Sequence, residues 1–220
     1  MSQKDISRRI LFPTHPTAEL AEFIGILTGD GHVSFEKTKN KIVITGNATT
    51  DLAYYNNYLL PLLKNLFNLN LEVKKRNNKA AIIVYFYSQA MVKFLTLQGY
   101  YKLRTKVIVP IWIFKSKLYT CGFLRGLYDT DGCIFRSDKR GSPGYPCIEL
   151  TTISFELANQ VKESLLRFEF RVPNIRSYVY KHSVNPSYKV SLYGFANVYR
   201  WNKMISFSNP YKYNRSADYP

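Results

Sequence analysis

The sequence repeats itself at a distance of 101 residues, and this repeat limits the possible folds more than any other feature. Residues 20–33 align with residues 121–134 without a gap, and Asp30 then falls on Asp131. Similarity at a fixed distance indicates that one structural unit occurs twice in the chain. We therefore expect two related halves, with no low-complexity linker between them.

The similarity continues beyond these first segments. Residues 49–53 resemble residues 154–158, and Tyr101-Lys102 resembles Tyr211-Lys212 near the two ends. A segment that contains Pro110 lies between the halves. We assign residues 1–106 to the first half, 107–117 to the connection and 118–220 to the second half.

Capping residues and turn signals predict the same order of elements in both halves. Thr17 and Ser88 are suited to cap helices, because a hydroxyl oxygen accepts backbone N–H groups. Apolar and β-branched runs between turn residues predict strands. We expect an α+β fold of two αββαββα halves, each with an antiparallel sheet. The expected helices cover 17–28, 49–67 and 88–99, begin at Ser116 and Ser154, and end near Ser206; the expected strands lie near 32–37, 41–45, 71–76, 80–87, 133–136, 147–152, 175–180 and 188–192.

Small residues recur at every fourth position in the first helix of each half. Residues four apart lie on one face of a helix, and a stripe of small residues lets two backbones approach closely. If these two helices pack side by side, Asp30 and Asp131 meet at one end. The stripes are Ala21, Gly25 and Gly29 in the first half and Gly122, Gly126 and Thr130 in the second.

Two carboxylates at helix ends are unfavourable unless something offsets their charge. The C-terminal end of a helix carries partial negative charge, and two neighbouring carboxylates repel each other. Divalent cations between them would remove both costs, and oxygen ligands favour a hard ion such as Mg²⁺. A single Asp-Gly pair is typical of a turn. Two copies at matching points of glycine-striped helices instead favour a cation site at Asp30 and Asp131.

The charge of the chain indicates the class of its partner. The sequence has 31 basic and 15 acidic residues and a net charge of +16, which favours nucleic acid. It has no apolar run of the roughly 18 residues that a membrane-spanning helix needs, and its start does not resemble a secretory signal. Its three cysteines are odd in number and lack zinc-ligand spacing. We expect an intracellular protein of the cytoplasm, with an organelle as the alternative, and no membrane partner.

Residues 124–132 closely resemble the motif that names the LAGLIDADG homing endonucleases, and residues 23–31 resemble it more loosely. The resemblance extends through both halves, and the two motifs in one chain resemble the monomeric members of the family, which contain two repeats. It implies two sheets that form a saddle over duplex DNA. It also implies that the last acid of each motif, Asp30 or Asp131, binds a catalytic metal ion.

The resemblance carries further implications for the site. It places Gly29 and Thr130 among the metal-binding residues, with Mg²⁺ as the cofactor and Ca²⁺ supporting binding without cleavage. Asp129 receives no metal role, because the first half has Thr28 at that position. The implied activity is a staggered double-strand break at a long, pseudo-symmetric DNA site, which promotes mobility of an intron.

Cations and polar residues along the expected strands are our candidates for DNA contacts. Alternate residues of a strand lie on one face of its sheet, and Arg, Lys and Asn side chains can read base edges in the major groove. Surface lysines that only guard a sheet edge are the alternative. The candidates are Lys37, Lys39, Lys41, Thr45, Asn47, Lys74 and Arg76 in the first half and Arg136, Lys139, Arg140, Arg176, Tyr178, Lys181 and Lys189 in the second.

The family resemblance also implies a lysine near the metals, shortly before a proline that follows the third helix. Lys106, four residues before Pro110, is our candidate in the first half, and Lys102 is the alternative. Lys212 is the candidate in the second half, because Tyr211-Lys212 repeats Tyr101-Lys102. Such a cation could polarise the attacking water or stabilise charge on the phosphate. A lysine that only positions phosphate is the other interpretation.

A second class of function remains open at this stage. An RNA maturase that binds intron RNA, or a regulator that binds DNA without cutting it, could share this fold. Loss of the motif acids would indicate that class, and both acids are present. The chain begins with Met1 and lacks a His-Asn end, so we expect a free-standing protein rather than an intein domain.

Overall fold

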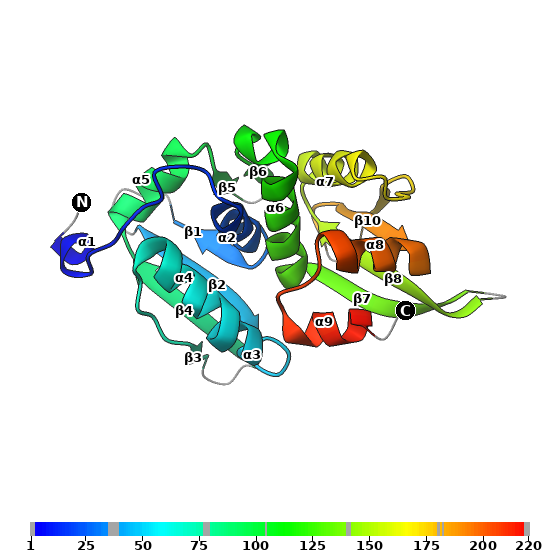
Figure 1. The fold of residues 1–220 in the computed structure, drawn as a ribbon, viewed down its shortest axis with the longest axis horizontal. Coiled ribbons are helices and arrows are strands. Elements are labelled where there is room, and N and C mark those ends of the chain that lie inside the picture. Colours follow the sequence, from blue (N-terminus) through cyan, green and yellow to red (C-terminus); the bar gives the residue numbers. More distant parts are fainter. Residues whose placement is uncertain are drawn as a thin grey trace.

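A computed structural model describes residues 3–34, 40–76, 80–103, 105–139, 142–179, 181 and 183–217 of the chain. Its two halves lie on either side of a central pair of helices, as Figure 1 shows. The elements follow one another in the predicted order in each half.

The first half contains one sheet of four antiparallel strands, ordered β1-β2-β4-β3. A π-helical turn joins α3 to α4, so the two form one continuous helical segment. The elements are α2 (Ala18–Thr28), β1 (Gly31–Val33), β2 (Lys41–Asn47), α3 (Leu52–Tyr54), α4 (Leu60–Phe67), β3 (Lys74–Lys75), β4 (Ala81–Tyr87) and α5 (Gln89–Leu97).

The second half repeats this arrangement. Its four strands are antiparallel and are ordered β7-β8-β10-β9, which matches the order of the first sheet position by position. The predicted pair of αββαββα halves is therefore confirmed. The elements are α6 (Lys117–Thr130), β7 (Gly132–Lys139), β8 (Ser142–Thr152), α7 (Phe155–Arg167), β9 (Arg176–Tyr178), β10 (Ser187–Tyr193) and α8 (Phe195–Met204).

Several short elements lie outside the αββαββα order of the two halves, and the sequence did not predict them. A hairpin of β5 and β6 follows the first half, and the boundary that we assigned after residue 106 divides it, because β6 pairs with β5. A last helix, α9, follows α8. These elements are α1 (Gln3–Ser7), β5 (Tyr101–Leu103), β6 (Lys106–Ile108), a 3₁₀ helix (Ile111–Lys115) and α9 (Pro210–Ala217).

Three of the five predicted helix caps form, whereas Ser116 makes no side-chain hydrogen bond to the start of α6. The hydroxyls of Thr17, Ser88 and Ser154 each accept a backbone N–H from the first turn of their helices. Thr49 does not cap α3, which begins at Leu52, because the Asn47 side chain accepts the N–H groups of residues 49 and 50 and forms a turn there. The helix therefore starts about one turn later than predicted.

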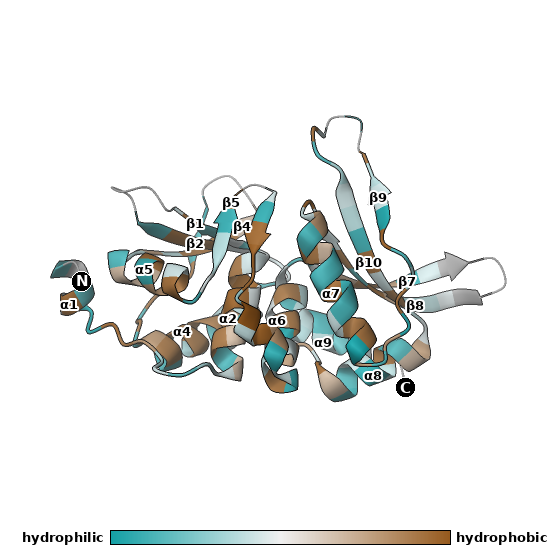
Figure 2. Ribbon diagram, turned by 90° about the horizontal axis from the view of Figure 1, so that it is seen from above, coloured by the Kyte–Doolittle hydropathy of each residue, from teal (hydrophilic) through white to brown (hydrophobic). Residues whose placement is uncertain are grey.

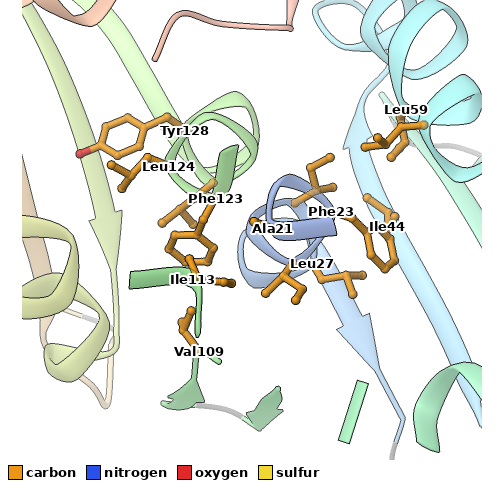
Figure 3. Packing of buried hydrophobic residues seen from close by; sticks show 14 of the residues in the cluster. Ala21, Phe23, Leu27, Ile44, Leu59, Val109, Ile113, Phe123, Leu124 and Tyr128 are labelled. Carbon is orange, nitrogen blue, oxygen red and sulfur yellow. The ribbon is translucent and has the colours of Figure 1, made fainter. Parts of the chain in front are cut away.

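The apolar core runs through both halves without a break and surrounds α2 and α6. Figure 3 shows Phe23 pointing from α2 toward Ile44 and Leu59 of the first half, while Phe123 of α6 lies beside Ile113. The two halves therefore share one core. No helix among the described residues is long and apolar enough to cross a membrane.

Candidate active site and DNA interface

The first helix of each half meets its counterpart along a seam of close backbone contacts. A Cβ atom added at Gly25 would lie 2.2 Å from the carbonyl oxygen of Phe123, and one added at Gly126 would lie 2.2 Å from that of Glu22. Only glycine leaves room for such an approach. Figure 1 shows α2 and α6 side by side between the two sheets. The predicted stripes of small residues therefore face each other.

The seam brings the two motif acids to the same end of the helix pair. A Cβ atom added at Gly29 would lie 2.1 Å from Thr130 Oγ1 and 3.3 Å from Asp131 Cγ. Asp30 and Asp131 follow the last residues of α2 and α6, so both stand where the helices end. The structure thus brings together all four residues that we expected at the metal site.

The electrostatics of the two acids reflect this proximity. The pKa of Asp30 is raised to about 7, mainly by burial and then by the carboxylates of Asp131 and Asp51. Lys212 and Lys102 act in the opposite direction and lower this pKa. Burial also raises the pKa of Asp131, while Lys102 and Lys212 lower it. The two carboxylates therefore resist carrying full charge at the same time, and a bound cation would relieve that cost.

One lysine lies at the end of each motif helix. Lys102 Nζ donates to the carbonyl oxygens of residues 28, 29 and 31 at 2.6, 2.6 and 2.9 Å. Lys212 Nζ donates to those of residues 128, 129 and 130 at 2.9, 2.7 and 2.9 Å. An ammonium has three N–H donors, so each side chain is fully engaged by the backbone. Burial lowers the pKa of both lysines, although nearby carboxylates oppose this.

Lys106, our first candidate for the lysine of the first half, lies away from the helix ends. In the hairpin it pairs with Leu103, whereas Lys102 pairs with Val107. Neighbouring residues of a strand point to opposite faces, so Lys106 shares the outward face of exposed Leu103 and lines a surface groove with Phe155. The alternative candidate, Lys102, occupies the position that corresponds to Lys212.

The face of the first sheet that points away from the core carries cations and aromatic rings. On β2, buried Ile42 and Ile44 alternate with less buried residues, so the latter share the opposite face. Lys41 and Lys74 place their Nζ atoms 4.9 and 5.5 Å from the ring centroid of Tyr85. We call this the open face of the first sheet. Of the predicted DNA contacts, it carries Lys41, Thr45, Asn47, Lys74 and Arg76.

The second sheet has an equivalent open face. Arg176 lies opposite Lys189 in the ladder of β9 and β10, and Lys189 alternates with the core residue Val190. Lys189 Nζ is 5.5 Å from the ring centroid of Tyr178, and the Arg176 guanidinium donates to the Tyr193 hydroxyl. Three predicted DNA contacts, Arg176, Tyr178 and Lys189, thus meet on one surface. Figure 2 shows α2, α4, α6 and α8 on the other side of the two sheets.

Not every predicted DNA contact falls on these faces. Arg136 lies on the same side of β7 as the core residue Ile134, so strand alternation directs it away from the open face, contrary to our expectation. Lys181 is exposed in the turn that follows β9. Lys37, Lys39 and Arg140 lie outside the described residues, as does the side chain of Lys139.

Comparison with known proteins agrees with this geometry. Residues 119–206 match the family described as "LAGLIDADG-like domain". The structure of I-DmoI in complex with DNA and Ca superposes on 91% of this chain and 96% of that one, with a TM-score of 0.62 and 15% sequence identity. The chain has the two-repeat LAGLIDADG fold. Full-length DUF199/WhiA from Thermatoga maritima also superposes, over 99% of this chain and 66% of that one, with a TM-score of 0.57 and 17% identity.

The curated relatives that this chain matches are much longer proteins. Replication factor C small subunit of Methanocaldococcus jannaschii is 31% identical over 198 residues, which are 88% of this chain and 10% of that protein. Ribonucleoside-diphosphate reductase NrdEB subunit alpha of Bacillus subtilis is 28% identical over 205 residues, 79% of this chain and 18% of that protein. The chain therefore spans between a tenth and a fifth of the relatives that it matches.

The residues at the LAGLIDADG helix ends suit a divalent cation of the Mg²⁺ class. Asp30 and Asp131 offer carboxylate oxygens, and hard cations prefer oxygen ligands. Among the described residues, no group of three or more His, Cys, Asp and Glu side chains gathers into a complete metal site. Each ion would thus need water or phosphate oxygens as further ligands, which fits a site that opens onto DNA.

Sequence reasoning missed Glu149, an acid on the open face of the second LAGLIDADG sheet. It is buried, and it accepts Lys189 Nζ and Ser191 Oγ at 2.7 Å each, with the Arg176 guanidinium at 3.9 Å. In the register of the first sheet, Val43 holds the equivalent position. The second open face therefore carries an acid where the first carries an apolar residue. In the sequence, the alternation of Glu149 with apolar residues was the signal that could have placed this acid on the open face.

Proposed function

We propose that the chain is a site-specific DNA endonuclease that hydrolyses phosphodiester bonds in both strands of a duplex with Mg²⁺ as cofactor. One observation carries the proposal. The acids Asp30 and Asp131 stand together at the end of the helix seam, between two open sheet faces that carry cations. A carboxylate pair in this position costs stability in the free protein, so its presence is best explained by a function.

Each part of the arrangement has a role in this proposal. The open faces would bind the phosphates and base edges of the duplex, and the carboxylates of Asp30 and Asp131 would hold the cations. A cation bound there would supply Lewis-acid stabilisation and would lower the pKa of a water molecule. Water oxygen forms a bond to phosphorus, the bond to the 3′ oxygen breaks, and that oxygen takes up a proton. Lys102 and Lys212 act through their charge, because the backbone occupies their N–H donors.

The comparisons support the proposal at the level of fold. I-DmoI has been crystallised with DNA and Mn, with DNA and Ca, and, as a variant, with its target DNA and Mg. The two curated relatives carry unrelated names, and each matches this chain over a small part of its length. We infer a module that occurs inside different proteins, which agrees with a mobile nuclease. We expect it to act as a monomer inside the cell, since both halves of the site come from one chain.

A protein that binds DNA without cutting it is the second candidate. The N-terminal LAGLIDADG domain of DUF199/WhiA, which is not named as a nuclease, shares the fold with a TM-score of 0.52 over 92% of this chain. The two motif acids favour the enzyme over this candidate. We assign no intron RNA partner, because neither the open faces nor the relatives favour RNA over DNA.

Isosteric changes at the two acids separate the candidates. A target duplex would first be selected from a random pool by binding in Ca²⁺. Asp30→Asn and Asp131→Asn should each abolish or severely slow double-strand cleavage in Mg²⁺ and preserve binding in Ca²⁺, because affinity comes mainly from the sheets. Glu163→Gln, on the exposed side of α7, is the control. Parental cleavage by both Asn variants would disprove the assignment, and melting curves would detect unfolding.

A further inference from the structure

Asp129 is a buried acid of the second motif whose carboxylate does not point at the cation site. It is 1% exposed. Its Oδ2 accepts the backbone N–H of Ser208 at 3.0 Å, and its Oδ1 accepts that of Asn209 at 3.1 Å. Both oxygens are therefore engaged by the turn that precedes α9.

This turn determines where α9 begins. Asn209 is fully buried, and its side-chain oxygen accepts the N–H of Tyr211 at 3.1 Å. Its carbonyl oxygen accepts the N–H groups of Lys212 and Tyr213 at 3.1 and 2.9 Å. The contacts of Asp129 thus fix the residue from which the first turn of α9 extends.

The same turn of α9 carries Lys212 back to the motif. Lys212 Nζ donates to the carbonyl oxygen of Asp129 at 2.7 Å, and the side chain is 9% exposed. The carboxylate of Asp129 therefore anchors the start of α9, and Lys212, the third residue of this helix, donates to the backbone of Asp129. Figure 1 shows α9 below the end of α6, where this closed arrangement lies.

The first half places its lysine by a different device. Thr28 occupies the position of Asp129, and its hydroxyl donates within its own helix to Ile24 at 2.7 Å. Lys102 comes from a strand, β5, which is fixed by pairing with β6. An anchoring acid is therefore found at the second motif and is replaced by a threonine at the first.

We propose that Asp129 is a positioning residue, which seats Lys212 at the second motif and has no such role at the first. The inference rests on the proposed nuclease for its effect on DNA, but its structural part does not. Its consequence is that the two strand cuts depend on different parts of the chain. Removing the anchor should impair the cut made beside Asp131 and spare the cut made beside Asp30, which leaves a nicked duplex.

Chemical labelling of lysines tests the structural part without cleavage. The parent and Asp129→Asn would be treated with acetic anhydride in EDTA, and acetylation would be read by mass spectrometry. We expect Lys212 to be labelled about tenfold faster in the variant, because the loss of one charge-assisted hydrogen bond changes an equilibrium by about that factor. The labelling rate of Lys102 should stay unchanged. Asn202→Ala is the matched control, because Asn202 bonds the last turn of α9 at Ser216. That variant should label Lys212 like the parent.

Strand-resolved cleavage of the selected duplex, with each strand end-labelled, tests the consequence. Asp129→Asn should cut one strand at the parental rate and the other about tenfold more slowly. This factor is the one expected if losing one charge-assisted hydrogen bond weakens the placement of Lys212 during cleavage. If both strands slow equally, or if Lys212 labelling stays parental, the proposal is overturned. If the parent cuts nothing, the proposed function fails and the labelling result still decides the role of Asp129.

A second variant covers the case in which Asp129→Asn does not fold. Asn209→Ala keeps the carboxylate and the two backbone N–H groups but removes the side-chain cap of α9. It should raise Lys212 labelling in the same direction. Parental labelling of Lys212 in a folded Asn209→Ala protein would overturn the proposal.

Discussion

A methyl group added at Gly25 tests the seam between the motif helices. The new Cβ would lie 2.2 Å from the carbonyl oxygen of Phe123 and 2.8 Å from the backbone nitrogen of Leu127. Both are backbone atoms of α6 and cannot rotate away. Gly99→Ala adds the same methyl group where the nearest atom is 4.0 Å away, but at a φ of +85°. The pair of variants therefore separates crowding from backbone strain.

The expected change in the free energy of unfolding is the difference between two opposing effects, helix propensity and overpacking. Alanine in place of glycine favours a helix by about 1 kcal/mol. Overpacking costs about 1–3 kcal/mol, and we take the upper end because the contact is between backbones. Gly25→Ala should then lose about 2 kcal/mol of unfolding free energy, or about 4–8 °C in Tm for a chain of this size. Gly99→Ala should lower the free energy of unfolding by about 1 kcal/mol, because alanine is strained in the left-handed backbone conformation at this position.

Thermal unfolding and urea titration of the metal-free protein would measure both losses. The ranking matters most, with Gly25→Ala less stable than Gly99→Ala and both less stable than the parent. A Gly25→Ala protein as stable as the parent, or more stable, would show that α2 and α6 do not touch along this stripe. The positions of Asp30 and Asp131 would then need another explanation.

Three further outcomes are expected. Arg125→Met should lower the free energy of unfolding by about 3 kcal/mol, because it leaves Glu22, a fully buried partner at 2.5 Å, without its cation. The double variant Arg125→Met with Glu22→Gln should recover most of this loss, as measured by chemical unfolding. If the losses of the two single variants simply add in the double variant, the two side chains do not stabilise each other. Glu149→Gln should strengthen binding to arbitrary duplex DNA and steepen its salt dependence by about one unit of slope, because the variant removes the carboxylate charge that offsets Lys189 on the open face. Fluorescence anisotropy at several salt concentrations would measure the slope, and a slope equal to that of the parent would contradict this prediction. For the parent, contact with roughly 8 phosphates predicts a slope of log K against log salt near −7, and a slope near zero in the same titration would rule out the DNA interface.

The repeat made most of the fold predictable. Two aligned copies of one unit, with Thr17, Ser88 and Ser154 as caps, define the order of helices and strands, because local signals determine where such elements begin. The glycine stripes also predicted that α2 and α6 would meet. The β5–β6 hairpin and α9 share only the Tyr-Lys pair of the repeat, and this pair lies in a strand in the first half and in a helix in the second, so the repeat did not predict either element.

The candidate site was predictable to the extent that it depends on the helices. The motif itself places Asp30 and Asp131, and the Tyr-Lys repeat places Lys102 and Lys212. The choice of Lys106 failed because it was made by distance from a proline, whereas the side-chain direction depends on the hairpin register. The alternation of Glu149 with apolar residues could have placed this acid on the open face, but its partners come from two other strands and depend on the register of the sheet.

The contact of backbones between α2 and α6 has a consequence for engineering. Since no flexible side chain separates these helices, the distance between the two motif acids is a fixed property of the polypeptide. In a nuclease of this design, that distance and the pitch of the duplex would set how many base pairs lie between the two breaks. Residues on the open faces could then be exchanged to recognise another sequence, and the overhang left on each product would keep its length.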